Sequence, residues 1–165
     1  MTAPVFDLIT KQLGEQVLGS GVAHGILVLD IGPDKVRAVA DALKSGHGFD
    51  MLLDVTAVDW LGQAGHAARF ELVWHFMRSS APARLRLKAD VAEDAPAVAS
   101  LTALYGSAAF MERECHEMFG IRFEGNADLR PILLYEGFAG HPLRKDYDKR
   151  REQPLVAYRD RTLPD

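Results

Sequence analysis

The chain has 165 residues, of which 48% are apolar and 25% are charged, and its net charge is −4. This length predicts one domain with a hydrophobic core, and the composition argues against extensive disorder. The negative net charge excludes the broad basic surface that non-specific nucleic-acid binding requires, so we expect no nucleic-acid partner.

The chain contains no stretch that approaches the ~20 consecutive apolar residues needed to cross a bilayer. Its N-terminal sequence has no basic opening followed by an apolar run, so we expect neither a leader peptide nor direct membrane insertion. The single cysteine, Cys115, excludes an internal disulfide.

The first half of the chain alternates helix and strand signals. Residues Val5–Val17 place an apolar residue at every fourth position before two glycines, which predicts an amphipathic helix with a glycine stop. The apolar run Gly25–Ile31 predicts a strand. Residues Val36–Leu43, which follow Pro33, have the apolar spacing of a second helix.

Three strand signals follow. Phe49–Trp60 is rich in Leu, Val and Thr, and Arg69–Arg78 and Arg84–Val91 alternate apolar with polar residues. Because short connections join antiparallel neighbours, we expect these strands to form a meander with one face exposed to water.

Two further helices are predicted. Glu93–Pro96 resembles a helix start, and the apolar spacing over Val98–Tyr105 predicts a helix that ends at Gly106. Ser107 is the expected N-cap of the next helix, and Gly120 is its expected C-cap. The apolar stripe of this last helix consists of Met111, Cys115, Met118 and Phe119.

Together these elements predict an α+β fold whose helices pack on one face of a mostly antiparallel sheet. Glycine and proline recur too often after Gly120 for a long regular element. We therefore expect a core at residues 1–120 and an extended, irregular, partner-binding arm at residues 121–165. Residues 148–165 have little apolar periodicity and are expected to order on assembly.

Cys115 and His116, with Glu117 and His141, suggest a metal site or a Cys-His nucleophile, as in a stand-alone metallo- or cysteine hydrolase. However, adjacent helical residues point about 100° apart, and the thiol lies on the stripe expected to be buried. The sequence contains no CxxC motif and no dinucleotide-binding loop. We expect no catalytic, cofactor-binding or metal-binding residue in this chain.

The C-terminal third carries a family resemblance. The motifs are Glu112-Arg113-Glu114, Met118–Ile121, Asp128-Leu129-Arg130 and Gly140–Tyr147. Together they resemble the signature of the 30 kDa subunit of respiratory complex I, the proton-pumping NADH:quinone oxidoreductase. The resemblance covers the chain from about Leu52 to Tyr147. The chain departs from the family pattern at Phe110, His116, Glu117 and Asp148.

This resemblance implies a cofactor-free structural subunit of the peripheral arm of that enzyme. It would dock the large quinone-site subunit and the small subunit that carries the terminal iron–sulfur cluster. FMN, iron–sulfur clusters and quinone would belong to the other subunits, and the assembly would lie on the cytoplasmic side of a bacterial cytoplasmic membrane. The alternative within the same lineage is the equivalent subunit of an energy-converting membrane-bound hydrogenase.

The charged residues of the last helix and the arm are the expected partner interface. Arg130 and Arg144 offer guanidinium forks to carboxylates or carbonyls of a partner. The alternative is a solvated surface with weak ion pairs. The full predicted interface comprises Glu112, Arg113, Glu114, Arg130, His141, Arg144, Lys145 and Asp146.

Overall fold

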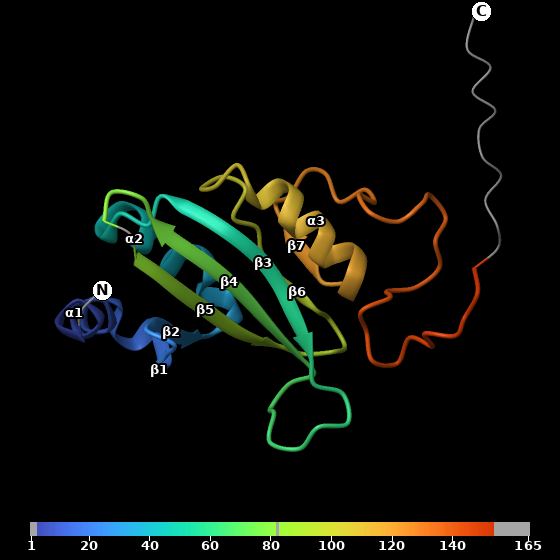
Figure 1. Ribbon diagram of the computed structural model, residues 1–165, viewed down its shortest axis with the longest axis horizontal. Helices are drawn as coiled ribbons and strands as arrows, with labels where there is room; N and C mark the ends of the chain where they lie inside the picture. Colours follow the sequence, from blue (N-terminus) through green and yellow to red (C-terminus); the bar gives the residue numbers. More distant parts are fainter. Residues whose placement is uncertain (1–2, 82, 154–165) are drawn as a thin grey trace, which may run out of the picture.

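The fold is built on a five-stranded mixed sheet, seen in a computed structural model that describes residues 3–81 and 83–153 (Figure 1). The strand order is β1-β2-β5-β4-β3. β2 and β5 run parallel, and the other neighbouring pairs are antiparallel. The strands are β1 (Val17–Ala23), β2 (Ile26–Ile31), β3 (Met51–Asp59), β4 (Phe70–Arg78) and β5 (Ala83–Val91). The predicted α+β class with a mostly antiparallel sheet is confirmed.

Three helices and a second, small sheet complete the described part of the chain. The helices are α1 (Ala3–Leu13), α2 (Val36–His47) and α3 (Ala108–Phe119). Short 3-10 turns at Gly14–Gln16 and Pro33–Lys35 precede β1 and α2. The small sheet is the parallel pair of β6 (Ala97–Ala99) and β7 (Arg122–Glu124). No helix in residues 3–81 and 83–153 is long and apolar enough to span a membrane.

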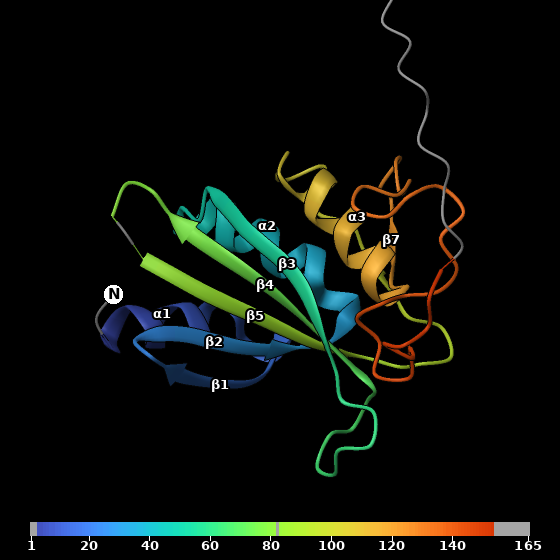
Figure 2. The same ribbon diagram turned by 45° about the vertical axis from the view of Figure 1, so that its right-hand side comes forward.

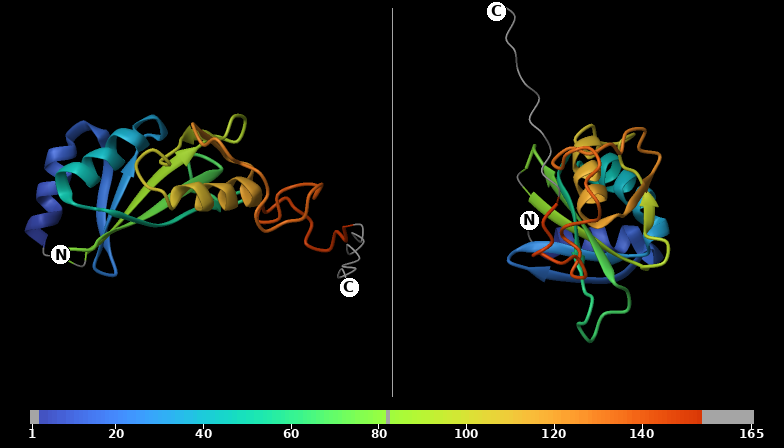
Figure 3. Two further views of the ribbon diagram at one scale, coloured as in Figure 1. Left: turned by 90° about the horizontal axis from the view of Figure 1, so that it is seen from above. Right: turned by 90° about the vertical axis from the view of Figure 1, so that its right-hand side faces the viewer.

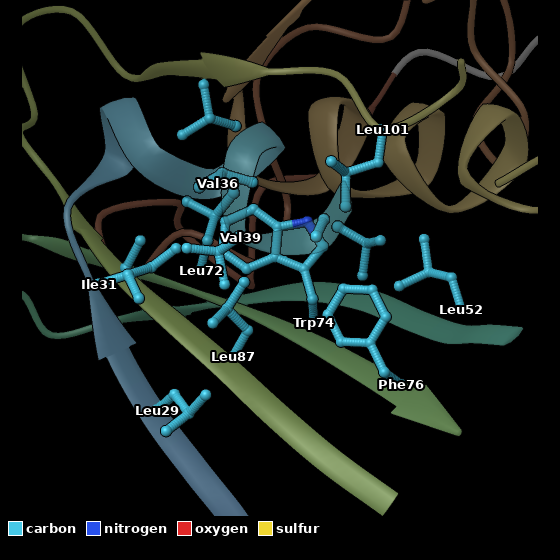
Figure 4. Packing of buried hydrophobic residues seen from close by; sticks show 14 of the residues in the cluster. Leu29, Ile31, Val36, Val39, Leu52, Leu72, Trp74, Phe76, Leu87 and Leu101 are labelled. Carbon is cyan, nitrogen blue, oxygen red and sulfur yellow. The ribbon is translucent and has the colours of Figure 1, made fainter. Parts of the chain in front are cut away.

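The core lies between the sheet and the helices because alternate strand residues point to one face. On β4 the buried face consists of Phe70, Leu72, Trp74 and Phe76, as the alternation predicts. Val36 and Val39, in the apolar stripe of α2, lie over Leu72 and Trp74 (Figure 4). The opposite sheet face mixes apolar and charged side chains, since it carries the buried Val73 and the ion pair between Lys88 and Glu71, whose charged atoms are 2.6 Å apart.

The first helix is shorter than predicted, and β1 was missed. Gly14 has φ of 54°, a left-handed conformation that favours glycine, and it follows the last residue of α1. Val17 therefore begins an edge strand, although its spacing matches the apolar stripe of the preceding helix. The strand exists despite two glycines because it pairs with β2.

The predicted helix over Val98–Tyr105 is wrong. Val98 pairs with Phe123 of β7, and the chain then turns, with the Tyr105 amide donating to the Leu101 carbonyl. Both Leu101 and Tyr105 are buried, and the Tyr105 hydroxyl donates to the Phe49 carbonyl at 2.8 Å. The apolar spacing therefore reflects a buried turn, because burial alone can place apolar residues at helical intervals.

The boundary between core and arm also moves. Ile121 and Phe123 are 0% and 1% exposed and belong to the core, so the irregular segment begins after Glu124. We call residues 125–153 the arm from here on. The arm lies beside α3, at the opposite end of the molecule from α1 (Figure 3). The loop between β3 and β4 projects from the sheet (Figure 2). Residues 154–165 of the predicted tail lie outside the described residues.

Candidate functional site

Helix α3 is the base of the site, and its apolar stripe packs as predicted. Cys115, Met118 and Phe119 are buried, while Met111 is half-buried against the core. Gly120 ends the helix in the left-handed conformation expected of a C-cap. Ser107 does not cap the other end, because its hydroxyl donates to the Leu52 carbonyl at 2.9 Å.

Glu112 does not lie on the charged outer face of α3. Its side chain is fully buried and accepts hydrogen bonds from the Ser100 hydroxyl, the Leu101 amide and the Asn126 side chain at 2.7–2.9 Å. Burial raises the pKa of this carboxyl, and the three hydrogen bonds oppose that rise. Glu112 therefore joins α3 to the two segments that follow β6 and β7. As the chain is folded, it cannot contact a partner.

Arg113 binds the backbone of the arm. Its guanidinium donates to the carbonyls of Arg130 and Pro131 at 2.9 and 3.0 Å, and it lies 3.7 Å from the Asp128 carboxylate. Arg130 folds onto the same carboxylate with two bonds of 2.8 Å, although its side chain is 82% exposed. These bonds from Arg130 hold the pKa of Asp128 below its usual range. The start of the arm is thus pinned to α3 by one arginine.

Glu117 fixes the next part of the arm. Its buried carboxylate accepts hydrogen bonds from the backbone amides of Ile132, Leu133 and Leu134, at 3.3, 2.9 and 2.8 Å. A carboxylate can accept this many donors because each of its two oxygens has two lone pairs. The arrangement turns the arm sharply against α3.

The C-terminal end of α3 receives the last part of the arm. His141 Nδ1 donates to the Glu117 carbonyl at 2.8 Å, and Arg144 Nε donates to the Phe119 carbonyl at 2.5 Å. These bonds satisfy carbonyls that a helix leaves without an internal partner. A Cβ at Gly120 would lie 2.6 Å from His141 Nε2 and 2.7 Å from Arg144 Nη2. Only glycine therefore allows both side chains to approach the helix end this closely.

A second attachment point lies where β3 ends and β4 begins. Asp59 is buried and accepts hydrogen bonds from Arg69 and from the Lys145 amide. Arg69 also forms ion pairs with Glu93 and, at 2.7 Å, with Asp146 of the arm. Burial alone would raise the pKa of Asp59, but the hydrogen bonds from Arg69 and the backbone amides lower it to about 2. The pKa of Asp146 is lowered by the same guanidinium.

Aromatic contacts organise the outer part of the arm. Phe138 lies between Tyr135 and Tyr147, with ring centroids 5.5 and 6.0 Å away, and the Gln153 side chain donates to the Tyr147 hydroxyl at 2.8 Å. A cavity of about 170 Å³ between α3 and the arm is lined in part by His116, Tyr135 and Phe138. This volume is below the roughly 300–1,000 Å³ of ordinary small-molecule sites, so its size favours a single side chain over a cofactor.

Cys115 does not have the surroundings of a catalytic thiolate. It is 2% exposed, and burial raises the pKa of its thiol. His116 is engaged elsewhere, since its Nδ1 lies 2.9 Å from the Ile121 carbonyl. Within residues 3–81 and 83–153, no group of three or more His, Cys, Asp or Glu side chains is placed to hold a metal ion.

The structure thus brings most of the predicted interface residues together, but many of them bind other residues of the same chain. Arg113, His141, Arg144 and Asp146 hold the arm to α3 and β4. Glu114, Arg130 and Lys145 remain exposed, and their contact with a partner stays a prediction. Sequence reasoning missed the part that Asp59, Arg69 and Glu117 take in holding the arm. The opposite charges at the facing ends of two adjacent predicted strands could have indicated the Asp59–Arg69 pair.

Comparison with known proteins gives a consistent set of matches. A family model described as the respiratory-chain NADH dehydrogenase, 30 Kd subunit, matches residues 29–153. The chain is 46% identical over 124 residues to an NADH-quinone oxidoreductase subunit of Trichlorobacter lovleyi, and the match covers 75% of each chain. It is 42% identical over 135 residues to the Cereibacter sphaeroides subunit of the same name, covering 81% of this chain and 66% of the relative.

Two solved structures share the fold. One is described as a trypsin-resistant fragment of Nqo5, with a TM-score of 0.64, 26% identity, and coverage of 76% of this chain and 97% of the fragment. The other is from an archaeal respiratory membrane complex, the membrane-bound sulfane sulfur reductase. It has a TM-score of 0.75 and 23% identity over 94% of this chain and 97% of that chain, which shows a common fold alone.

Proposed function

Because this chain belongs to the family of the respiratory-chain NADH dehydrogenase 30 Kd subunit, we propose that it is a structural subunit of a proton-translocating NADH:quinone oxidoreductase. It carries no redox group of its own and lies in the peripheral arm of that enzyme. FMN, the iron–sulfur clusters and quinone are held by other subunits. The chain supports electron transfer from NADH to quinone by keeping those subunits in place.

The observation that carries this proposal is the state of the arm. Residues 125–153 contain almost no regular structure, yet Arg113, Glu117, Arg144 and Arg69 bind them firmly to the domain. An irregular segment held in one shape by so many charged side chains is pre-organised. Pre-organisation lowers the entropic cost of binding and suits a segment that docks another protein.

We assign the arm to the large quinone-site subunit and to the subunit that carries the terminal iron–sulfur cluster. The assembly lies against the cytoplasmic side of the cytoplasmic membrane through its membrane subunits. Exposed Lys145 offers a cationic contact and exposed Leu143 an apolar one, while exposed Arg130 already pairs with Asp128. Rim charges of this kind steer association and fix register more than they add affinity.

Isolation of the tagged chain from its native membranes tests this proposal. We expect flavin, iron–sulfur clusters and NADH-oxidising subunits to co-purify with it. Lys145→Glu should lower the amount of assembled enzyme, because the Lys145 side chain is exposed and only its backbone amide bonds to Asp59. The matched control is Lys11→Glu, at an exposed position of α1 at the far end of the molecule. A wild-type level of assembled enzyme in both variants would contradict the docking role.

A second candidate is the equivalent subunit of a related energy-converting membrane-bound hydrogenase. The departures from the family pattern at His116 and Glu117 support this second candidate, because both residues lie where α3 meets the arm. The same purification separates the two functions. A nickel–iron centre without flavin or NADH-oxidising subunits would select the hydrogenase relative.

A further inference from the structure

One side of α3 is left uncovered by the sheet, and the arm covers only the C-terminal end of that side, at Glu117. Phe110, Glu114 and Glu117 recur at the i, i+4, i+7 spacing, so they lie along one side of the helix. Cys115 and Phe119, on the other side, are buried in the core. Phe110 is 60% exposed, and Glu114 is also exposed. Phe110 and Glu114 therefore face away from the domain, whereas Glu117 lies under the arm.

The arm extends this side of α3 through Glu117. Because its carboxylate holds the amides of residues 132–134, the turn has one fixed orientation. Leu134 packs against the core, whereas Leu133 and Ile132 are 63% and 38% exposed. A buried carboxylate thus serves to present a leucine to the surface beyond Glu114.

Phe110 and Leu133 are large, exposed apolar side chains, the first on helix α3 and the second on the turn that Glu117 holds. Neighbouring exposed side chains of this kind mark binding surfaces, and aromatic residues are enriched among the energetically dominant contacts. Along the helix, Glu114 lies between Phe110 and Glu117, whose carboxylate holds the Leu133 amide, and Glu114 forms no ion pair with any residue of 3–81 or 83–153. This side of α3 therefore carries one negative charge, without an ion-pair partner in the described part of the chain, between two exposed apolar side chains.

We propose that this α3 stripe, defined as Phe110, Glu114, Ile132 and Leu133, binds a segment of a partner subunit in which arginine or lysine is flanked by apolar side chains. The inference rests on the proposed function and names the chemistry of one contact. A carboxylate that becomes desolvated in an interface needs hydrogen-bond donors opposite it, and an arginine or lysine supplies both the donors and the opposite charge. A second copy of this chain fits less well, because two-fold pairing through the stripe would bring two Glu114 carboxylates together.

Site-specific photo-cross-linking in the native complex tests the contact directly. Phe110 is replaced by p-benzoylphenylalanine, and the purified complex is irradiated and digested. We expect an adduct with another subunit, mapped by mass spectrometry to a peptide that has Arg or Lys beside apolar residues. The matched control is the same replacement of Leu18, which is 75% exposed on β1, at the opposite edge of the sheet from β3 (Figure 1). The control should not label that peptide.

Three cross-linking results would overturn the inference. One is the absence of an adduct with another subunit, and the second is an adduct with a second copy of this chain. The third is labelling of the same peptide from Leu18.

Charge reversal gives an independent result. Glu114→Lys should reduce the amount of chain retained in the purified complex about tenfold, and Glu114→Gln should reduce it less, because like charges facing each other are strongly unfavourable. Neither change should alter the thermal unfolding of the isolated chain, since Glu114 has no intramolecular ion pair among the described residues. If Glu114→Lys is retained normally while Lys145→Glu is lost, the stripe is not a contact but the docking function stands. If both are retained normally, the docking function fails as well.

Discussion

Glu117→Gln is the sharpest test of how the arm is held. The variant keeps the size of the side chain, but it has one acceptor oxygen in place of two, and its NH2 group would face a backbone N–H donor. Hydrogen bonds to charged groups contribute about 1.5–3 kcal/mol each, and neutral ones about 0.5–1.5 kcal/mol. The freed amides of Ile132 and Leu133 can bind water, because these residues are exposed. We therefore expect the local attachment of the arm to weaken by about 2 kcal/mol, which is about thirtyfold in an equilibrium constant.

Hydrogen–deuterium exchange of the Leu133 and Leu134 amides measures this change. Their exchange should accelerate about thirtyfold if it occurs through local opening of the arm, while amides of β4 should exchange as before. Glu114→Gln, one turn earlier on the same helix, is the matched control and should leave both amides unchanged. If the Glu117 variant leaves the exchange of Leu133 and Leu134 unaltered, the carboxylate does not hold the arm in solution.

Three further substitutions test the core and the attachment points. Asp59→Asn should cost about 2 kcal/mol of unfolding free energy at pH 7, because the folded-state pKa of about 2 lies below the ordinary 3.8. That difference should shrink in denaturant titrations as the pH falls from about 4 to about 2, and a constant difference would contradict the Arg69 pairing. Gly120→Ala should destabilise more than Gly137→Ala, since both have positive φ but only Gly120 is crowded; equal losses in urea would exclude the crowding. Met118→Asp should lower the melting temperature sharply, at about 3 kcal/mol or more, because it places a charge in the core. An unaltered calorimetric transition would mean that this side of α3 is not buried.

The sequence predicted the fold best where the spacing of apolar residues along the chain matches the residues that are buried in the structure. Alternation over β4 and β5 identified their buried faces, since each strand contributes one face to a single core. The apolar residues of α3 that pack in or against the core, Met111, Cys115, Met118 and Phe119, and the glycine C-cap of this helix were predicted for the same reason. Local signals decide these elements, and tertiary contacts reinforce them.

Prediction failed where a tertiary contact overrode the local signal. Residues 98–105 have helical spacing, but pairing of Val98 with Phe123 and burial of Leu101 produce a strand and a turn. Glu112 was placed on the surface because glutamate is rarely buried. Its partners, the Leu101 amide and the Asn126 side chain, come from segments whose proximity depends on β6 pairing with β7.

The arm shows why charge alone was an incomplete guide to the interface. Arg113, His141 and Arg144 donate to backbone carbonyls, while Glu117 accepts from backbone amides. Every residue except proline offers both groups, so no sequence pattern identifies which carbonyl or amide a given charge will find. The charges that best match the family signature therefore act first within the chain, where they set the shape of an irregular segment. The docking that we propose is left to the few exposed charges and to apolar side chains, such as Leu133, which that shape turns outward.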